Sequence, residues 1–342
     1  MKYAEFEGAG QLTIKDYPLP KIEQPDDVIL KVVRTCVCGS DLWAYRGFEE
    51  QGPENDGHEA LGIVQAVGAE ITTVKPGDFV IAPFTHGCGH CRACLAGFDG
   101  DCQNHTDNFS NGCQAEYIRF QHGQWALVKV PGQPSDYSEG MLKSLLTLAD
   151  VMATGYHAAR VANVQPGDSV IVLGDGAVGL CAIIAAKLRG ATQIISTSRH
   201  PSRQALASEF GATINIAERG DEGIKKLIAA SNGGADAVLE CVGTELSTNE
   251  SLKVGRPGAI IGRVGLPHGD KIDPSETFER NNSLAGGPAS VTTYDKALLL
   301  KAVLDGKINP GKVFDGTFTL DQIEEAYQAM TDRQVIKSYI VL

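Results

Sequence analysis

The sequence predicts an α/β protein of two domains, a doubly wound parallel sheet and an irregular, mainly antiparallel β domain. The chain has 342 residues, 43% of them hydrophobic, which is more than one compact core usually holds. Its first part carries short β-rich runs between glycine and proline turns, whereas apolar strands and long helices alternate from Asp168 onward. We therefore expect one domain over 1–152 and 290–342, and a second over 153–289.

The β-rich domain is expected to contain short strands bounded by turns. Turn signals lie at Gly68, at Pro76-Gly77 and at Pro131-Gly132. The expected strands are 28–34, 63–67 and 78–82. Two amphipathic helices, 294–304 and 321–331, and a last strand, 337–342, complete this domain.

The second domain shows a regular alternation of strand and helix. The expected strands are 169–173, 193–197, 235–241 and 259–264, and the expected helices are 177–189 and 203–210. Strands separated by helices run parallel, and several such units in series form a doubly wound sheet.

A Gly-x-Gly-x-x-Gly turn at 174–179 follows the first of these strands and opens a helix. Its glycines permit a tight turn, close approach of a pyrophosphate and close helix packing, and the amides at the helix start attract negative charge. A plain glycine turn is the alternative, which the strand, the helix and the further strands disfavour. The predicted dinucleotide-binding residues here are Gly174, Gly176, Ala177, Val178 and Gly179.

The residues at the end of the expected strand 193–197 indicate whether the cofactor is NAD or NADP. An acid about 20 residues beyond the glycines holds the adenosine 2′-hydroxyl of NAD, and the window 196–203 contains none. Ser198, Arg199 and Arg203 instead offer donors that suit a 2′-phosphate. The alternative is that both arginines are solvated at a helix start. The window favours NADP, with NAD as the less favoured cofactor.

Charge and composition exclude several partners. The balance of 30 basic and 42 acidic residues leaves a net charge of −12, which argues against nucleic acid. We expect no membrane span and no signal peptide, and hence a cytoplasmic protein. In that compartment the nine cysteines stay reduced, so that clustered cysteines indicate metal ligands.

Two groups of residues have the composition of zinc sites. Four cysteines in the segment 86–103 could close a tetrahedron around a structural zinc ion: Cys88, Cys91, Cys94 and Cys102. Cys38, His58 and Asp150 could provide three ligands and leave a fourth position open for catalysis. Taken singly, these three residues could instead be a buried small side chain, a core histidine and a helix cap.

These motifs together resemble the zinc-containing medium-chain alcohol dehydrogenases over essentially the whole chain. The motifs are Cys38-Gly39-Ser40-Asp41, Gly57-His58-Glu59 through Gly62 with Gly68, Pro76-Gly77-Asp78, the four-cysteine segment, the glycine turn, Ala237 through Gly243, and Val264-Gly265. The resemblance implies a GroES-like β domain, two zinc ions per chain and a homo-oligomer, either a tetramer or a dimer.

The resemblance also implies roles for individual residues. Cys38 and His58 would bind the catalytic zinc with Asp150 as third ligand, and Glu59 would contact the zinc transiently. Asp41 would orient His58, and Ser40 would accept the alcohol proton. Val264 and Lys337 would contact the cofactor. Trp43 is a departure, because many members have a relay histidine at that position.

The implied reaction moves a hydride between a small, secondary alcohol, or its ketone, and NADP. In the reverse direction the protein would reduce a ketone or an aldehyde, and a polyol or an amino alcohol is the alternative substrate. A zinc- and dinucleotide-binding redox sensor without catalysis is the alternative from another class, but no catalytic ligand is missing. A zinc-free quinone reductase is disfavoured because such proteins lack both cysteine groups.

Overall fold

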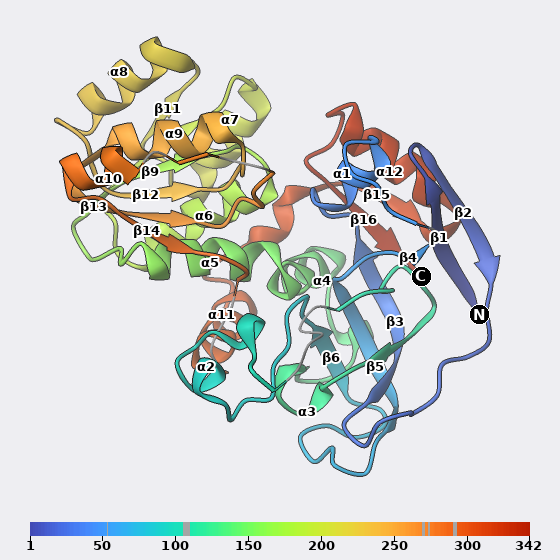
Figure 1. The fold of residues 1–342 in the computed structure, drawn as a ribbon. Helices are drawn as coiled ribbons and strands as arrows, with labels where there is room; N and C mark the ends of the chain where they lie inside the picture. The colour runs from blue at the N-terminus through green and yellow to red at the C-terminus, as the bar shows by residue number, and fades with distance from the viewer. Residues whose placement is uncertain (53, 105–109, 269–270, 273, 290–292) are drawn as a thin grey trace. The chain divides into compact units, whose positions relative to one another are not determined.

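The computed structural model describes residues 1–52, 54–104, 110–268, 271–272, 274–289 and 293–342 (Figure 1). The chain divides into two compact units. Unit 1 comprises Met1–Asp150 and Ser290–Leu342, and unit 2 comprises Val151–Ala289. Within the described ranges, no helix combines the length and the apolar character needed to cross a membrane.

Unit 1 is built on a mainly antiparallel sheet. Its strands are β3 (Val28–Cys36), β5 (Ala60–Val67), β6 (Phe79–Ala82), β7 (Tyr117–Phe120), β8 (Val128–Val130), β15 (Phe314–Thr319) and β16 (Lys337–Val341). Their order is β15-β16-β3-β5-β6-β8, with β7 paired to β3 beside this path. Only the β15–β16 pairing is parallel among these described strands. A smaller sheet in the order β2-β1-β4 joins β1 (Lys2–Gly8), β2 (Gln11–Asp16) and β4 (Glu54–Asn55).

The helices of unit 1 are mostly short. They are α1 (Asp41–Tyr45), α2 (Arg92–Leu95), α3 (Gly123–Ala126), α4 (Glu139–Leu146), α11 (Thr293–Leu304) and α12 (Ile323–Thr331), with 3₁₀ turns η1 (Asp99–Asp101), η2 (Pro134–Asp136), η3 (Thr147–Ala149), η4 (Pro310–Val313) and η5 (Leu320–Gln322). The helix predicted over 321–331 therefore begins as a 3₁₀ turn and is α-helical only from Ile323. Tighter i→i+3 turns are common at helix starts.

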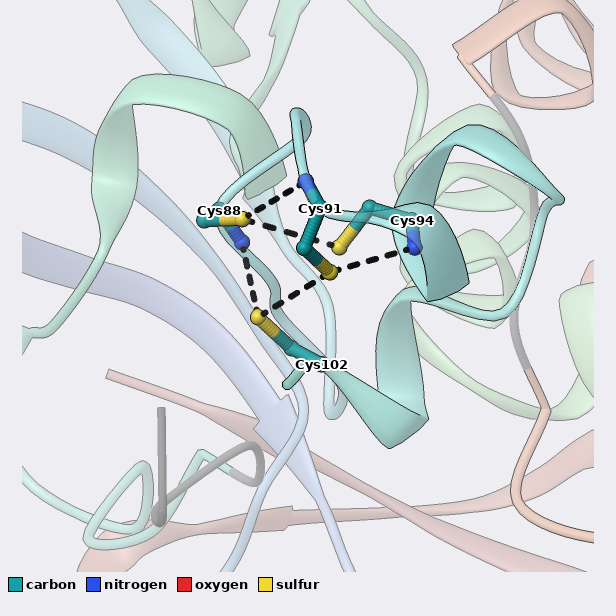
Figure 2. A group of neighbouring side chains, drawn as sticks. All are labelled: Cys88, Cys91, Cys94 and Cys102. Carbon is teal, nitrogen blue, oxygen red and sulfur yellow. Dashed lines mark hydrogen bonds between the residues drawn. The ribbon is translucent and has the colours of Figure 1, made fainter. Parts of the chain in front are cut away.

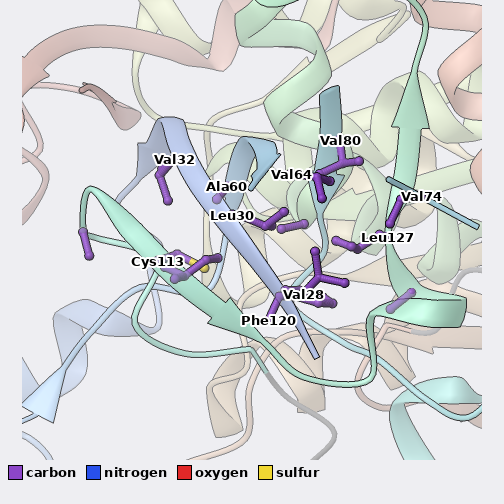
Figure 3. Packing of buried hydrophobic residues seen from close by; sticks show 14 of the residues in the cluster. Val28, Leu30, Val32, Ala60, Val64, Val74, Val80, Cys113, Phe120 and Leu127 are labelled. Carbon is purple, nitrogen blue, oxygen red and sulfur yellow. The ribbon is translucent and has the colours of Figure 1, made fainter. Parts of the chain in front are cut away.

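Buried aliphatic side chains of β3, β5 and β6 form one core of unit 1 (Figure 3). Val28, Leu30 and Val32 alternate along β3 and are at most 2% exposed. They pack with residues such as Val64 and Val80 of the neighbouring strands. An alternation with period two directs one face of each strand into the core. This core supports the strand end from which Cys38 extends.

Unit 2 is a parallel sheet flanked by helices. Its strands are β9 (Ser169–Leu173), β10 (Gln193–Thr197), β11 (Ile214–Ile216), β12 (Ala235–Glu240), β13 (Gly255–Arg263) and β14 (Ser283–Gly286). Its helices are α5 (Val151–Val161), α6 (Ala177–Leu188), α7 (Pro201–Phe210), α8 (Gly220–Ala230), α9 (Glu245–Val254) and α10 (Pro274–Arg280). The strand order is β11-β10-β9-β12-β13-β14, and the described pairings are all parallel.

Helices cover both faces of this sheet, with α5 on one side and α8 and α9 on the other (Figure 1). The residues of β9 from Val170 to Leu173 are at most 2% exposed, as expected for a strand buried on both faces. The predicted doubly wound sheet is confirmed, and β9 and β10 have the predicted bounds. Helix α7 begins at Pro201 rather than at Arg203, because proline suits the first turn of a helix.

Candidate functional site

Four potential metal ligands from distant parts of the sequence meet in unit 1. Cys38 lies between β3 and α1, His58 and Glu59 directly precede β5, and Asp150 lies between η3 and α5. One ligand atom from each side chain lies within 4.8 Å of the others. Each segment ends or begins a regular element, so that its backbone is held by the sheet or by a helix.

The separations of these atoms fit a tetrahedral metal ion. Asp150 Oδ2 lies 3.5 Å from Cys38 Sγ and 3.6 Å from His58 Nε2. Ligands about 2.0–2.3 Å from a zinc ion in a tetrahedron stand about 3.3–3.8 Å apart. Glu59 Oε1 is farther, 4.0 Å from His58 Nε2, and its Oε2 atom is buried without a hydrogen-bond partner among the described residues.

Asp41 positions the imidazole of His58. Its Oδ1 atom lies 3.4 Å from His58 Nδ1, and its Oδ2 atom accepts a hydrogen bond of 2.8 Å from the Cys38 amide. Nε2 therefore faces the other ligands. Burial lowers the pKa of His58, but the charges of Asp41 and Cys38 outweigh it and hold that pKa well above its usual range. The cluster thus favours positive charge at the place where a metal cation fits.

Lys337 of β16 lies beside the same cluster and contacts Glu59. Its ammonium donates to Glu59 Oε1 at 2.7 Å and to the Val37 carbonyl at 3.0 Å, and both charged side chains are 1% exposed. Lys337 was predicted to contact the cofactor, and its pairing with Glu59 was not predicted. Its contacts in unit 1 are with the carboxylate that lies beside the ligand set.

Ser40 and Trp43 lie at the start of α1, next to Cys38. Ser40 is half-buried, and its hydroxyl makes no capping hydrogen bond to the helix. The Trp43 ring packs edge-on against Phe48, with 5.6 Å between the ring centroids. The Ser40 hydroxyl is therefore available to a ligand. The Trp43 indole occupies the position at which the resemblance would place a relay histidine.

The four cysteines of the segment 86–103 form a second cluster, in which the sulfur atoms converge (Figure 2). The Sγ atoms of Cys88 and Cys94 are 4.0 Å apart, as are those of Cys91 and Cys102. Four thiolates about 2.3 Å from a zinc ion would stand about 3.8 Å apart. Cys88 is half-buried and the other three cysteines are buried. Four sulfur ligands would leave no open coordination position on the metal ion.

Two backbone amides favour the thiolate state of Cys91. Cys91 Sγ accepts from the amides of Cys94 and Gln103, each at 3.5 Å. These hydrogen bonds lower the pKa of the Cys91 thiol to about 6. A metal-binding cysteine must be deprotonated, so that this shift supports a metal-ligand role for Cys91, whereas burial raises the pKa of the Cys94 thiol. Lys296 of α11, with Nζ 3.5 Å from Asp99 Oδ2, ties the segment to the rest of unit 1.

The predicted dinucleotide-binding residues gather at one edge of the sheet in unit 2. Leu173, Glu240 and Arg263 are paired in register, so that the glycine turn and Val264 follow strand ends at the same edge. Gly174 adopts φ +116°, and a Cβ on Gly179 would stand 2.1 Å from the Gly174 carbonyl oxygen. The first turn of α6, with Ala177 and Val178, has no side-chain cap, so that its amides remain available to a phosphate.

The end of β10 lies beside this turn, as its sequence position suggests. The Gly174 amide donates to Thr197 Oγ1 at 3.3 Å, and Ser198, Arg199 and Arg203 follow. Arg199 is exposed, whereas Ser198 and Arg203 both bind Asp175, the second residue of the glycine turn. Asp175 lies outside the window 196–203 that predicted the cofactor, and its role was not predicted. Its position between the first two glycines was the available signal.

Comparisons with known proteins relate both units to zinc-dependent dehydrogenases. Residues 24–132 match the family model described as an alcohol dehydrogenase GroES-like domain, and residues 177–298 match the zinc-binding dehydrogenase model. The chain is 31% identical to a zinc-type alcohol dehydrogenase-like protein of Bacillus subtilis, over 96% of each chain.

Solved structures agree with these matches. The alcohol dehydrogenase TADH from Thermus sp. ATN1 has a TM-score of 0.89 at 28% identity, covering 100% of this chain and 99% of that one. Zinc-dependent alcohol dehydrogenase 2 from Streptococcus pneumonia has a TM-score of 0.88 at 29% identity, covering 100% and 98%.

Proposed function

The chain belongs to the zinc-containing medium-chain alcohol dehydrogenases, and from this premise we propose that it transfers a hydride between a small, secondary alcohol and NADP. The observation that carries the proposal is the cluster of Cys38, His58 and Asp150 with Glu59 beside it. Three protein ligands leave the fourth position that a catalytic zinc site needs. The four cysteines of the segment 86–103 would hold a second, structural zinc ion.

The protein's own residues hold the reacting groups and move the proton. When bound, the zinc ion supplies Lewis acidity toward an alcohol oxygen, and the nicotinamide cofactor accepts the hydride. Asp41 keeps His58 Nε2 directed at the ligand set through its contact with Nδ1. Lys337 neutralises Glu59, which limits the negative charge that a bound alcohol would meet. The Ser40 hydroxyl, which is half-buried, would accept the alcohol proton while it releases its own proton to water.

The preference for NADP rests on the end of β10. Positions 196–203 hold no acid but include Arg199 and Arg203, and Arg203 donates to the Asp175 carbonyl in the glycine turn. Charge-assisted pairing with a 2′-phosphate contributes about 1.5–3 kcal/mol, which corresponds to about tenfold or more in affinity. The two arginines would therefore favour the phosphorylated cofactor.

A panel of small secondary alcohols, primary alcohols and polyols, assayed with both cofactors, tests this proposal. We expect kcat/KM to be highest for a secondary alcohol and about tenfold or more higher with NADP than with NAD. A polyol as the best substrate would contradict the substrate class. A higher kcat/KM with NAD would contradict the cofactor preference and leave the zinc chemistry standing.

Asp150→Asn tests the third zinc ligand. Asparagine retains the capping ability of aspartate but binds zinc more weakly, so that we expect zinc affinity and kcat to fall by about 10–100-fold. Zinc titration against a chelator and steady-state kinetics measure both effects. Asp136→Asn is the matched control, because Asp136 caps η2 by accepting from the Gln133 amide at 2.8 Å. Full zinc content and full rate in Asp150→Asn would assign Asp150 to capping alone.

A further inference from the structure

The glycine turn of unit 2 carries an acid that contacts the end of β10. Ser198 Oγ donates to Asp175 Oδ2 at 2.6 Å. Arg203 Nη1 donates to the Asp175 carbonyl at 3.1 Å and to Asp175 Oδ1 at 3.3 Å. The Asp175 side chain is 17% exposed and that of Arg203 is 13% exposed. The three side chains form a partly buried group, referred to below as the Asp175 cluster.

The hydrogen bonds within the Asp175 cluster determine which groups of a ligand the cluster can bind. A serine hydroxyl has one hydrogen to donate, and here it points at the Asp175 carboxylate. Its oxygen accepts the His200 amide at 3.1 Å. Ser198 is 2% exposed, whereas the Asp175 side chain is 17% exposed, so that the Asp175 carboxylate presents oxygen acceptors to a ligand. A ribose 2′-hydroxyl can donate to such a surface, whereas a 2′-phosphate has only acceptor oxygens to offer.

The charges in the Asp175 cluster also disfavour a 2′-phosphate relative to a 2′-hydroxyl. Arg203 is paired with Asp175, so that the two charges nearly cancel at this point. A 2′-phosphate beside them would gain less attraction than an unpaired Arg203 would give, and it would meet the carboxylate at close range. Arg199 is exposed, where water screens its charge.

We propose that Asp175 weakens the discrimination against NAD, by accepting a hydrogen bond from the adenosine 2′-hydroxyl and repelling a 2′-phosphate. In dinucleotide-binding folds such an acid normally stands at the end of the second strand; in this chain the glycine turn after β9 supplies it. The inference rests on the proposed dinucleotide site. It implies that Asp175 keeps the NADP preference smaller than Arg199 and Arg203 would otherwise produce.

Asp175→Asn tests this inference without turnover. The asparagine amide can donate to Ser198 Oγ, and its carbonyl oxygen can still accept from Arg203, so that the variant removes the carboxylate charge and keeps both contacts. Calorimetric titration with adenosine 5′-monophosphate and with adenosine 2′,5′-bisphosphate isolates the 2′ position. We expect the Kd of the bisphosphate to fall about tenfold relative to that of the monophosphate.

The control is Asp236→Asn, which removes another arginine-paired aspartate from unit 2. Asp236 Oδ1 accepts from Arg256 Nε at 2.7 Å at the start of β12, the end opposite to the glycine turn. This variant should leave the ratio of the two Kd values unchanged. Asp175→Gly repeats the test with a residue that tolerates every turn conformation, so that a folding defect of the asparagine variant cannot decide the outcome.

The results separate this inference from the proposed cofactor preference. A ratio that shifts by less than about threefold in both Asp175 variants, with folding intact, would overturn the role of Asp175. Wild-type protein that binds the monophosphate more tightly, but shifts toward the bisphosphate in Asp175→Asn, would overturn the NADP preference and support the role of Asp175.

Discussion

Cys38→Ala is expected to lower kcat by about three orders of magnitude or more, since it removes a ligand of the proposed catalytic zinc. Metal Lewis acidity supplies several kcal/mol of transition-state stabilisation, and each 1.36 kcal/mol is about tenfold in rate. The fold should survive, because the Cys38 contact with Asp41 is made by the backbone amide rather than by the thiol.

Steady-state kinetics, zinc analysis and thermal unfolding of Cys38→Ala measure these effects together. We expect zinc content to fall by about one equivalent per chain with little change in melting temperature. Cys181→Ala is the matched control, because this buried cysteine of α6 belongs to neither ligand group and should keep its zinc and most of its activity. Near wild-type turnover in Cys38→Ala would contradict a zinc-dependent reaction at this cluster.

Cys91→Ala is expected to have its largest effect on stability. It removes one of four thiolates that converge in the segment 86–103 and deletes the acceptor of two backbone amides. Loss of a bound metal is among the few mechanisms that cost more than about 4 kcal/mol. We expect the free energy of unfolding of unit 1 to fall by about 3–5 kcal/mol, and the melting temperature by about 10 °C.

Thermal unfolding, limited proteolysis near the segment 86–103 and zinc analysis test the role of Cys91. His90→Ala is the matched control: His90 lies in the same loop, is exposed, and is outside the ligand group. The control should keep its zinc and melt close to the wild type. If Cys91→Ala also keeps its zinc and its melting temperature, the four-cysteine cluster is not a structural metal site.

Much of unit 2 could be predicted because short stretches of the sequence specify its strands and helices. The strands at 169–173 and 193–197 have the predicted bounds, since a buried parallel strand is a short apolar run between turn residues. Several elements of unit 1 were not predicted, among them β1, β2 and β15. Their sequences, KYAEFEG, QLTIKD and FDGTFT, are rich in polar and charged residues and contain no continuous apolar run.

Sequence alone determined the fold class, the family and the residue types of both metal-ligand groups, because spacing, glycine turns and ligand chemistry are written in short motifs. Only the tertiary structure decided which charged groups stand together. Lys337 binds Glu59 across 278 positions of the chain, and Asp175 binds Ser198 across 23. Such pairs arise where sheet order brings separate strand ends to one edge. No local pattern encodes that juxtaposition, and a buried charge is stabilised only by the partner that packing supplies.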